Sequence, residues 1–227
     1  MKRYYTYNRV LLFLFVALIH MQCKQKPVTS SGAEAKVDPT SNSEIAGAKR
    51  LFDGESLANW EITNFGTEGE VYVSDGELVL GMGDGCTGIT WADSFPKVNY
   101  EVSLEAKRVM GIDFFCGLTF PVNDDFCTFI VGGWAGPVVG LSTIDGLDAS
   151  ENETRTLLRF SKNEWYTIRL RVTIEKIETW INEEKIVDLR YQGRKLGIRP
   201  EVDRSCPFGI ATWKTTGAVR NMYLRML

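Results

Sequence analysis

The segment from residue 165 to residue 189 constrains the fold more than any other part of the chain. Between residues 166 and 174, apolar and polar side chains alternate at every position, which is the period of a β-strand with one buried face. A reversal at residues 175–176 leads into a return strand, and a two-residue loop there would place Leu170 opposite Ile181. A second reversal leads into a third strand. Because an isolated hairpin is not stable in water, this meander predicts a larger antiparallel sheet.

The rest of the domain contains short strands of the same kind. Turn residues such as Asp75–Gly76 and Gly132–Gly133 separate the apolar runs, and no segment has a long helical period. Many short strands joined by such turns are typical of a β-sandwich or jelly roll. We therefore predict one all-β domain over residues 50–227. Its further strand-like runs cover residues 70–74, 77–80, 88–91, 99–106, 114–120, 126–131, 138–141, 208–213 and 219–225.

The first 23 residues have the pattern of an export signal. Three basic residues accompany an uninterrupted apolar run at 10–19, which is too short for a comfortable membrane span. Cys23 stands where a bacterial lipoprotein is cleaved and lipidated; the alternative is plain secretion, with a thiol beside an ordinary cleavage site. Residues 24–49 are small and polar and predict a flexible tether. We expect an exported protein of the cell envelope or periplasm, held to the membrane by a lipid anchor.

Removal of this signal changes the charge of the chain. The net charge is −3 for the full sequence and becomes −6 without Lys2, Arg3 and Arg9, because the signal contains no acidic residue. An acidic surface argues against nucleic acid as a partner. The single histidine, His20, is lost with the signal. Catalytic Ser-His or Cys-His pairs and histidine metal ligands are therefore excluded from the mature domain.

Four cysteines remain in the predicted domain. An even number in an exported protein permits two disulfides with three possible pairings, and buried free thiols are the alternative. A tight hairpin at residues 123–124 would place Cys127 opposite Phe120 and four positions away from Cys116. The four residues are Cys86, Cys116, Cys127 and Cys206.

Several motifs stand out along the domain: LFDGESLANW at 51–60, VSDGELVL at 73–80, NYEVSLEA at 99–106, WYTIRLRV at 165–172 with TWIN at 179–182, and the closing strands from 209 to 225. With these motifs, residues 50–227 resemble the 3-keto-disaccharide hydrolase domain family. The resemblance implies a concanavalin-like jelly-roll β-sandwich of two antiparallel sheets, with sugars handled on a concave face. In active members it implies cleavage of glycosides oxidised at the 3-position. The chain departs from the family by lacking histidine and by a cysteine- and aromatic-rich stretch at 111–120.

Three acidic residues are candidates for acid/base chemistry. Glu101 and Glu105 share one face of a strand, about 13 Å apart at the backbone, so each would need a carboxylate from a neighbouring strand to form a catalytic pair. Asp113 precedes Phe114–Phe115, where partial burial would favour the protonated form that a general acid needs. The alternatives are two solvated glutamates on an exposed face and an aspartate in a turn.

The stretch from 145 to 155 is a long polar loop with four acids. Asp145 begins this loop, and a solvated rim beside an active site is the favoured interpretation. Calcium is the alternative, although the spacing of the acids matches no EF-hand. We predict no other metal and no organic cofactor.

Three tryptophans are candidates for stacking on sugar rings. The apolar face of a pyranose packs on an indole while neighbouring polar groups bind the hydroxyls. Trp134 follows two glycines, Trp180 lies on the face that carries Arg171, and Trp213 precedes Lys214. Burial in the core is the alternative for each indole.

These observations support two functions. The first is a glycoside hydrolase-like enzyme that cleaves 3-keto disaccharides and other 3-keto glycosides by carboxylate acid/base chemistry. The second is a non-catalytic carbohydrate-binding sandwich on the cell envelope. The fold serves both. The family resemblance and the acids favour the enzyme, whereas the missing histidine favours the binding module.

Overall fold

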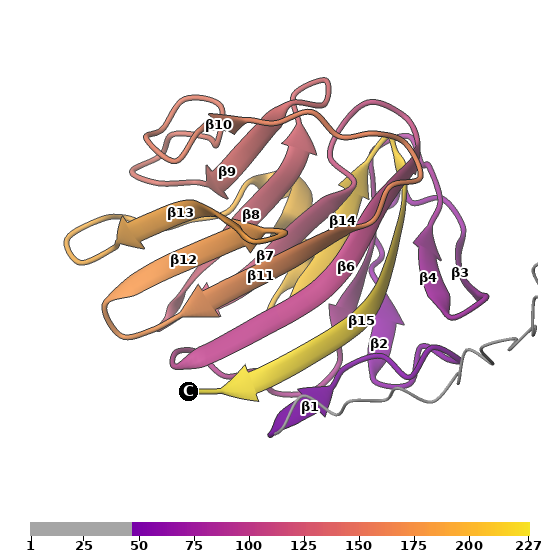
Figure 1. The fold of residues 1–227 in the computed structure, drawn as a ribbon, viewed down its shortest axis with the longest axis horizontal. Coiled ribbons are helices and arrows are strands. Elements are labelled where there is room, and N and C mark those ends of the chain that lie inside the picture. The colour runs from indigo at the N-terminus through magenta and orange to yellow at the C-terminus, as the bar shows by residue number, and fades with distance from the viewer. Residues whose placement is uncertain (1–46) are drawn as a thin grey trace, which may run out of the picture. The chain divides into compact units, whose positions relative to one another are not determined.

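The alternating segment forms a meander of β11 (Tyr166–Val172), β12 (Lys176–Ile181) and β13 (Glu184–Arg190) in a computed structural model that describes residues 47–227 (Figure 1). Leu170 pairs with Thr179 rather than with Ile181, so the expected two-residue loop was wrong. The reversal lies one residue earlier than expected, at residues 174–175: the Thr173 N–H donates to the Lys176 carbonyl at 3.0 Å, and the Thr173 hydroxyl accepts the N–H of Lys176 at 3.1 Å. Because the shift is two residues, the side chains of both strands keep their predicted faces, but Ile174, expected on the buried face, lies in the turn and is 61% exposed.

An eight-stranded sheet contains this meander. Its strand order is β13-β12-β11-β6-β15-β4-β3, and β1 pairs with β15. All the strand pairs in the sheet are antiparallel. The bounds of its remaining strands are β1 (Ala48–Arg50), β3 (Val71–Ser74), β4 (Glu77–Leu80), β6 (Tyr100–Met110) and β15 (Thr216–Met226).

A seven-stranded sheet forms the second layer, in the order β10-β9-β8-β7-β14-β5-β2. Its strands are also antiparallel, so the predicted fold, a sandwich of two antiparallel sheets, is confirmed. Its strands are β2 (Trp60–Ile62), β5 (Cys86–Trp91), β7 (Cys116–Val122), β8 (Asp125–Gly133), β9 (Val138–Ser142), β10 (Thr156–Leu157) and β14 (Gly209–Trp213).

The core lies between the two sheets. On β6, Leu104 points inward and is buried, while Glu101 and Glu105 on the same strand belong to the outer face. On β7, Phe120 points inward and Thr119 outward. This division of each strand into a core side and an outer side determines which residues are available for a ligand.

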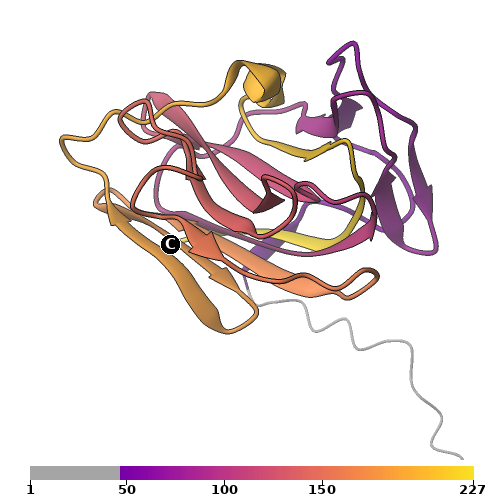
Figure 2. The ribbon, with the colours of Figure 1, turned by 90° about the horizontal axis from the view of Figure 1, so that it is seen from above.

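One short 3-10 helix, η1 (Pro200–Ser205), lies against β5 and β14 (Figure 2). It covers part of the outer face of the seven-stranded sheet: Thr90 of β5 donates its hydroxyl to the carbonyl of Arg204 at 3.0 Å. Neither η1 nor the short strands β1, β2 and β10 were expected from the sequence. Within residues 47–227, no helix is long and apolar enough to cross a membrane.

The first strand lies at the junction of the predicted tether and the predicted domain. Strand β1 begins at Ala48, two residues before position 50, and pairs with β15 at the other end of the chain. The predicted signal, Cys23 and nearly all of the predicted tether lie outside the described residues.

The four cysteines of residues 47–227 are free thiols. Cys127 lies opposite Phe120, as the hairpin predicted, and therefore far along the strand from Cys116. Both thiols point into the core. Of the two alternatives, the structure shows free thiols, buried in Cys86, Cys116 and Cys127 and partly exposed in Cys206.

Candidate functional site

A cavity of about 230 Å³ lies on the outer face of the seven-stranded sheet. The floor comes from β8 and β9, where Thr128, Ile130 and Ser142 point away from the core. The Thr128 hydroxyl is 3.0 Å from the Thr119 hydroxyl, and the two form a hydrogen bond. The cavity is lined by Asp113, Phe114, Thr128, Ile130, Trp134, Ser142, Arg199, Glu201, Val202 and Trp213.

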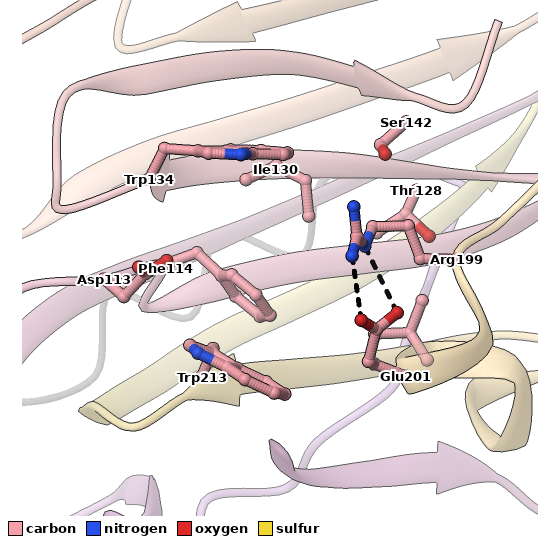
Figure 3. Close-up of a pocket in the computed structure, with 10 residues that line it drawn as sticks. Asp113, Phe114, Thr128, Ile130, Trp134, Ser142, Arg199, Glu201 and Trp213 are labelled. Carbon is pink, nitrogen blue, oxygen red and sulfur yellow. Dashed lines mark hydrogen bonds and ion pairs between the residues drawn. The ribbon is translucent and has the colours of Figure 1, made fainter. Parts of the chain in front are cut away.

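Aromatic rings form the walls of this cavity. Figure 3 shows Trp134 and Trp213 on opposite sides, with Phe114 reaching between them at one end. Trp134 is 38% exposed and follows the last residue of β8. Gly117 of β7 makes room for Phe114, since a Cβ there would lie 3.1 Å from the phenyl ring. The walls therefore present flat apolar surfaces to anything that enters.

The opposite end of the cavity is charged. Arg199 forms a two-point ion pair with Glu201, with nitrogen–oxygen distances of 3.2 and 2.8 Å. Arg199 also pairs with Asp148, which accepts the Ser142 hydroxyl at 3.2 Å. The hydrogen bonds from Arg199 lower the pKa of Glu201, and those to Glu201 raise the pKa of Arg199. Both groups are charged at neutral pH.

Asp113 lies at the aromatic end and acts as a hydrogen-bond acceptor. One carboxylate oxygen accepts the N–H of Phe114 at 2.8 Å, and the other accepts the N–H of Ala135 at 3.1 Å. Its own N–H donates to the hydroxyl of Thr215 at 3.0 Å. Asp113 thus connects the start of β7 to the turn that carries Trp134.

Glu101 and Glu105 do not join Asp113. Both lie on the outer face of the eight-stranded sheet, on the other side of the core. Glu101 is bound by Arg171 and Arg225. Glu105 is bound by Arg220 at 2.7 Å and by the Asn221 amide at 3.3 Å. Because β6 belongs to the sheet that does not carry the cavity, neither glutamate can reach it. Both side chains form ion pairs on the outer face of their own sheet instead.

Trp180 and Arg171 are also on that opposite face. The guanidinium of Arg169 lies 3.9 Å from the centroid of the Trp180 ring, and that of Arg171 lies at 5.3 Å. The indole is buried beneath these cations. Of the three predicted stacking tryptophans, only Trp134 and Trp213 line the cavity.

The two remaining candidates lie near the cavity without lining it. Lys214 is exposed, with its ammonium 5.8 Å from the centroid of the Trp213 ring. Asp145 pairs with Arg194 and accepts the N–H of Lys195, both on a neighbouring segment. The loop that contains Asp145 contacts a cavity residue through Asp148, which pairs with Arg199.

Three of the four acids of that loop, Asp145, Asp148 and Glu153, pair with arginines. Arg194 binds Glu153 at 2.5 Å as well as Asp145. Over residues 47–227, no group of three or more histidine, cysteine, aspartate or glutamate side chains has the arrangement of a metal site. The side chain of Asn152 donates to the carbonyls of Leu141 and Leu147, so hydrogen bonds organise this loop.

Arg199 and Glu201 are the main residues that sequence reasoning missed. They lie in a segment without strand periodicity, just before and within η1. Thr128 and Ser142 were also missed, because β8 and β9 are continuously buried strands without alternation that would show which face each residue occupies.

Sequence comparison identifies the family of the domain. The profile of the 3-keto-alpha-glucoside-1,2-lyase-like domain matches residues 47–225. The chain belongs to this family. Membership confirms the resemblance carried by the motifs, and this lyase-like domain spans both sheets and the cavity. A comparison with curated proteins gave no significant match.

Solved structures share the fold of this lyase-like domain. A glycosyl hydrolase-like protein of Parabacteroides distasonis has 16% identity and a TM-score of 0.54, over 80% of this chain and 94% of that one. A Bacillus subtilis protein with a galectin-like fold has 10% identity and a TM-score of 0.57, over 79% and 94%. A carbohydrate-binding module of Bacillus subtilis has 13% identity and a TM-score of 0.51, over 74% and 95%. At these identities the likeness concerns the sandwich architecture.

Proposed function

We propose that the protein binds a carbohydrate in the cavity between Trp134 and Trp213. The observation that carries this proposal is the pair of indoles on opposite sides of one cavity with a charged, hydroxyl-bearing end (Figure 3). A sugar ring has apolar C–H faces and polar edges, so it matches aromatic walls combined with hydrogen-bonding groups. The solved structures that share the fold include a carbohydrate-binding module and a carbohydrate recognition domain, which supports a sugar as the ligand class.

The charged end favours a neutral sugar. The guanidinium of Arg199 is already shared between Asp148 and Glu201, so two carboxylates accompany one cation there. Hydroxyl groups can donate to these carboxylates and accept from the remaining guanidinium N–H groups. A ligand carboxylate would meet excess negative charge instead. We therefore expect neutral glycosides to bind in preference to uronic acids.

The size of the cavity indicates a short ligand segment. Its volume of about 230 Å³ is below the roughly 300–1,000 Å³ of pockets that enclose drug-sized ligands. One sugar unit would occupy the space between the indoles, with the rest of the glycoside extending past exposed Trp134. Because the family is named after lyases of 3-keto-alpha-glucosides, we take a 3-keto glucosyl unit as the primary ligand.

Cleavage of such a glycoside is the second candidate function, and the family match favours it. A lyase breaks the C2–H and C1–O bonds and forms a C1=C2 double bond, and the 3-keto group makes the C2 proton acidic. One group takes that proton and another protonates the departing oxygen. Asp113 and Glu201, at opposite ends of the cavity, are the carboxylates available for carboxylate acid/base chemistry. Hydrolysis by the same pair would instead add water at C1.

The present geometry favours binding over cleavage. Both oxygens of Asp113 accept backbone N–H groups, and the Arg199 ion pair makes Glu201 a weaker base. A general base is most effective when its pKa lies near the working pH. The lyase candidate therefore requires that a bound substrate displace Arg199 from Glu201.

Calorimetry with methyl 3-keto-α-glucoside, methyl α-glucoside and methyl α-glucuronide tests the binding proposal. Trp134→Ala and Trp213→Ala should each weaken binding of the first compound at least about tenfold, the effect expected for a central aromatic contact. Trp165→Ala is the matched control, because this partly exposed indole stacks on Arg220 of the opposite sheet. Equal effects of all three variants, or none from the cavity variants, would contradict the proposal.

Product analysis on the same samples tests the lyase candidate. An unsaturated keto sugar would identify elimination, and a free 3-keto sugar without a double bond would identify hydrolysis. Glu201→Gln and Asp113→Asn should each abolish either product. Unchanged substrate after long incubation with wild-type protein would leave binding as the function.

We also propose that the protein is exported and anchored to the cell envelope by a lipid on Cys23. Residues 1–23 support this proposal through their basic start, their apolar run and the position of the cysteine. Residues 24 to about 47 would then separate the sugar-binding domain from the membrane.

A further inference from the structure

Arg108 is a buried cation at a core position of β6. The inward-facing residues Val102, Leu104 and Ala106 are buried apolar side chains, and the same stripe continues to Arg108, which is only 6% exposed. Its guanidinium lies 5.1 Å from the centroid of the Phe115 ring. A charged group in such surroundings is costly unless hydrogen bonds compensate it.

The partners of this guanidinium are backbone carbonyls of the opposite layer. Its Nη2 donates to the carbonyls of Gly132 at 3.1 Å, Gly136 at 3.3 Å and Asp113 at 3.3 Å. Its Nε has no partner among the described residues. Arg108 therefore reaches from the eight-stranded sheet into the two loops that carry Phe114 and Trp134.

The loop that carries Trp134 has an unusual backbone. Four of the five residues from 132 to 136 have left-handed φ values: 80° at Gly132, 49° at Trp134, 62° at Ala135 and 112° at Gly136. For residues with a Cβ such values are strained and persist only when the surroundings hold them. A Cβ at Gly132 would lie 2.5 Å from Nη2 of Arg108, so glycine there leaves room for the guanidinium.

Asp113 holds the same turn from the cavity side. It accepts the N–H of Ala135, directly after Trp134. Arg108 donates to the carbonyls of Gly132 and Gly136, which precede and follow Trp134 in the chain. We propose that Arg108 and Asp113 form a two-sided clamp that positions Trp134 at the wall of the cavity. The proposal deepens the carbohydrate-binding function and rests on it for the ligand, whereas the positioning of Trp134 is testable without any ligand.

Fluorotryptophan NMR of the full domain tests the clamp directly. The resonance of Trp134 is assigned by its loss in Trp134→Phe. In Arg108→Met, which keeps length but removes charge and donors, this resonance should shift or broaden more than that of any other tryptophan. The resonance of Trp180 on the opposite sheet should stay in place and report that the fold is intact.

Arg220→Met is the matched control. Like Arg108, Arg220 stacks on an aromatic ring, with its guanidinium 4.1 Å from the Trp165 centroid, but its hydrogen-bond partner is the Glu105 carboxylate on the opposite sheet from the cavity. Its loss should move the resonance of Trp165 and leave that of Trp134 unchanged. If Arg108→Met does not fold, Asp113→Ala applies the same test through the Ala135 N–H. An unaltered Trp134 resonance in folded Arg108→Met, or in Asp113→Ala, overturns the proposal.

Calorimetry with methyl 3-keto-α-glucoside adds a functional measurement. Arg108→Met should lose at least about tenfold in affinity, as Trp134→Ala does, because a disordered wall must be ordered again on binding. If the wild type does not bind this compound, the proposed function fails while the NMR result still decides on the clamp. Tight binding by Arg108→Met with a displaced Trp134 would contradict the part of the proposal that concerns the ligand.

Discussion

Arg171 of β11 and Glu101 of β6 form an ion pair across neighbouring strands. The Nε and Nη2 of Arg171 donate to one carboxylate oxygen at 2.8 and 2.7 Å, and Arg225 donates to the other at 2.8 Å. Glu101 is only 8% exposed. The carboxylate therefore stabilises the eight-stranded sheet and is not free for catalysis.

Glu101→Gln should lower the free energy of unfolding by about 1.5–3 kcal/mol at neutral pH, the range for hydrogen bonds to charged groups. The reason is that the arginines would lose their shared anion. Urea denaturation measures this change. Sugar binding should stay unchanged, since Glu101 lies on the opposite face from the cavity, and a parallel loss of binding would contradict the position that we assign to the site.

The same residue predicts an acid-dependent stability. Burial alone would raise the pKa of Glu101, but the hydrogen bonds from Arg171 and Arg225 outweigh it and hold the pKa below its ordinary value. Stability from this group is therefore present above the unfolded pKa, about 4.3, and is lost as the pH falls through the folded pKa. Between pH 7 and about pH 3, the free energy of unfolding should therefore fall less for Glu101→Gln than for the wild type, as urea denaturation at each pH would measure. If the free energy of unfolding falls equally with pH in both proteins, carboxylates other than Glu101 cause the loss of stability in acid, and the prediction is wrong.

Leu170→Ala should lower the free energy of unfolding by roughly 2–5 kcal/mol, because this side chain is fully buried between the sheets. Thr167→Ala is the control on the same strand, at an exposed position, and should cost no more than about 0.5 kcal/mol. Chemical denaturation of both variants gives the comparison. Similar losses would mean that the two faces of β11 are assigned incorrectly.

The four thiols of the domain should react slowly with iodoacetamide in the native state. Burial raises the pKa of Cys86 and Cys127 to about 12 and that of Cys206 to about 11, and it also raises that of Cys116. Little reactive thiolate is then present at neutral pH. Mass spectrometry should find Cys206 modified first, because it is the only one of the four that is not fully buried. Rapid labelling of Cys116 would contradict this structure.

Wild-type protein should partition with membranes in a bacterial host, and Cys23→Ala should not, since lipidation requires that thiol. Membrane fractionation with detection of the domain measures this outcome. A wild type that is processed yet remains in the soluble fraction would show that the signal directs plain secretion.

Local pattern accounts for much of the fold. The period of two in residues 166–172 shows which side chains of β11 face the core, because this strand buries only one face. A register error of two residues at the β11–β12 turn left these faces correct. The turn itself depends on the Thr173 hydroxyl, which no periodicity reveals.

The composition of the site was only partly predictable. Asp113, Trp134 and Trp213 were identified as polar and aromatic residues beside glycines or at strand ends, and the structure brings all three to one cavity. Arg199 and Glu201 come from a segment that shows no strand or helix pattern, and only the position of η1 against β5 and β14 places them there.

The sequence by itself determined the longer strands, the buried face of β11 and the family to which the domain belongs. The tertiary structure decided which sheet each strand joins. Glu101 and Asp113 are twelve residues apart, yet Gly111, with a φ of 95°, lies where the chain leaves β6 in one sheet for β7 in the other. Alternation shows that one face of a strand is buried, but both sheets bury a face in the same core. Which outer face a residue reaches is therefore set by long-range strand pairing, and that pairing separates the two acids.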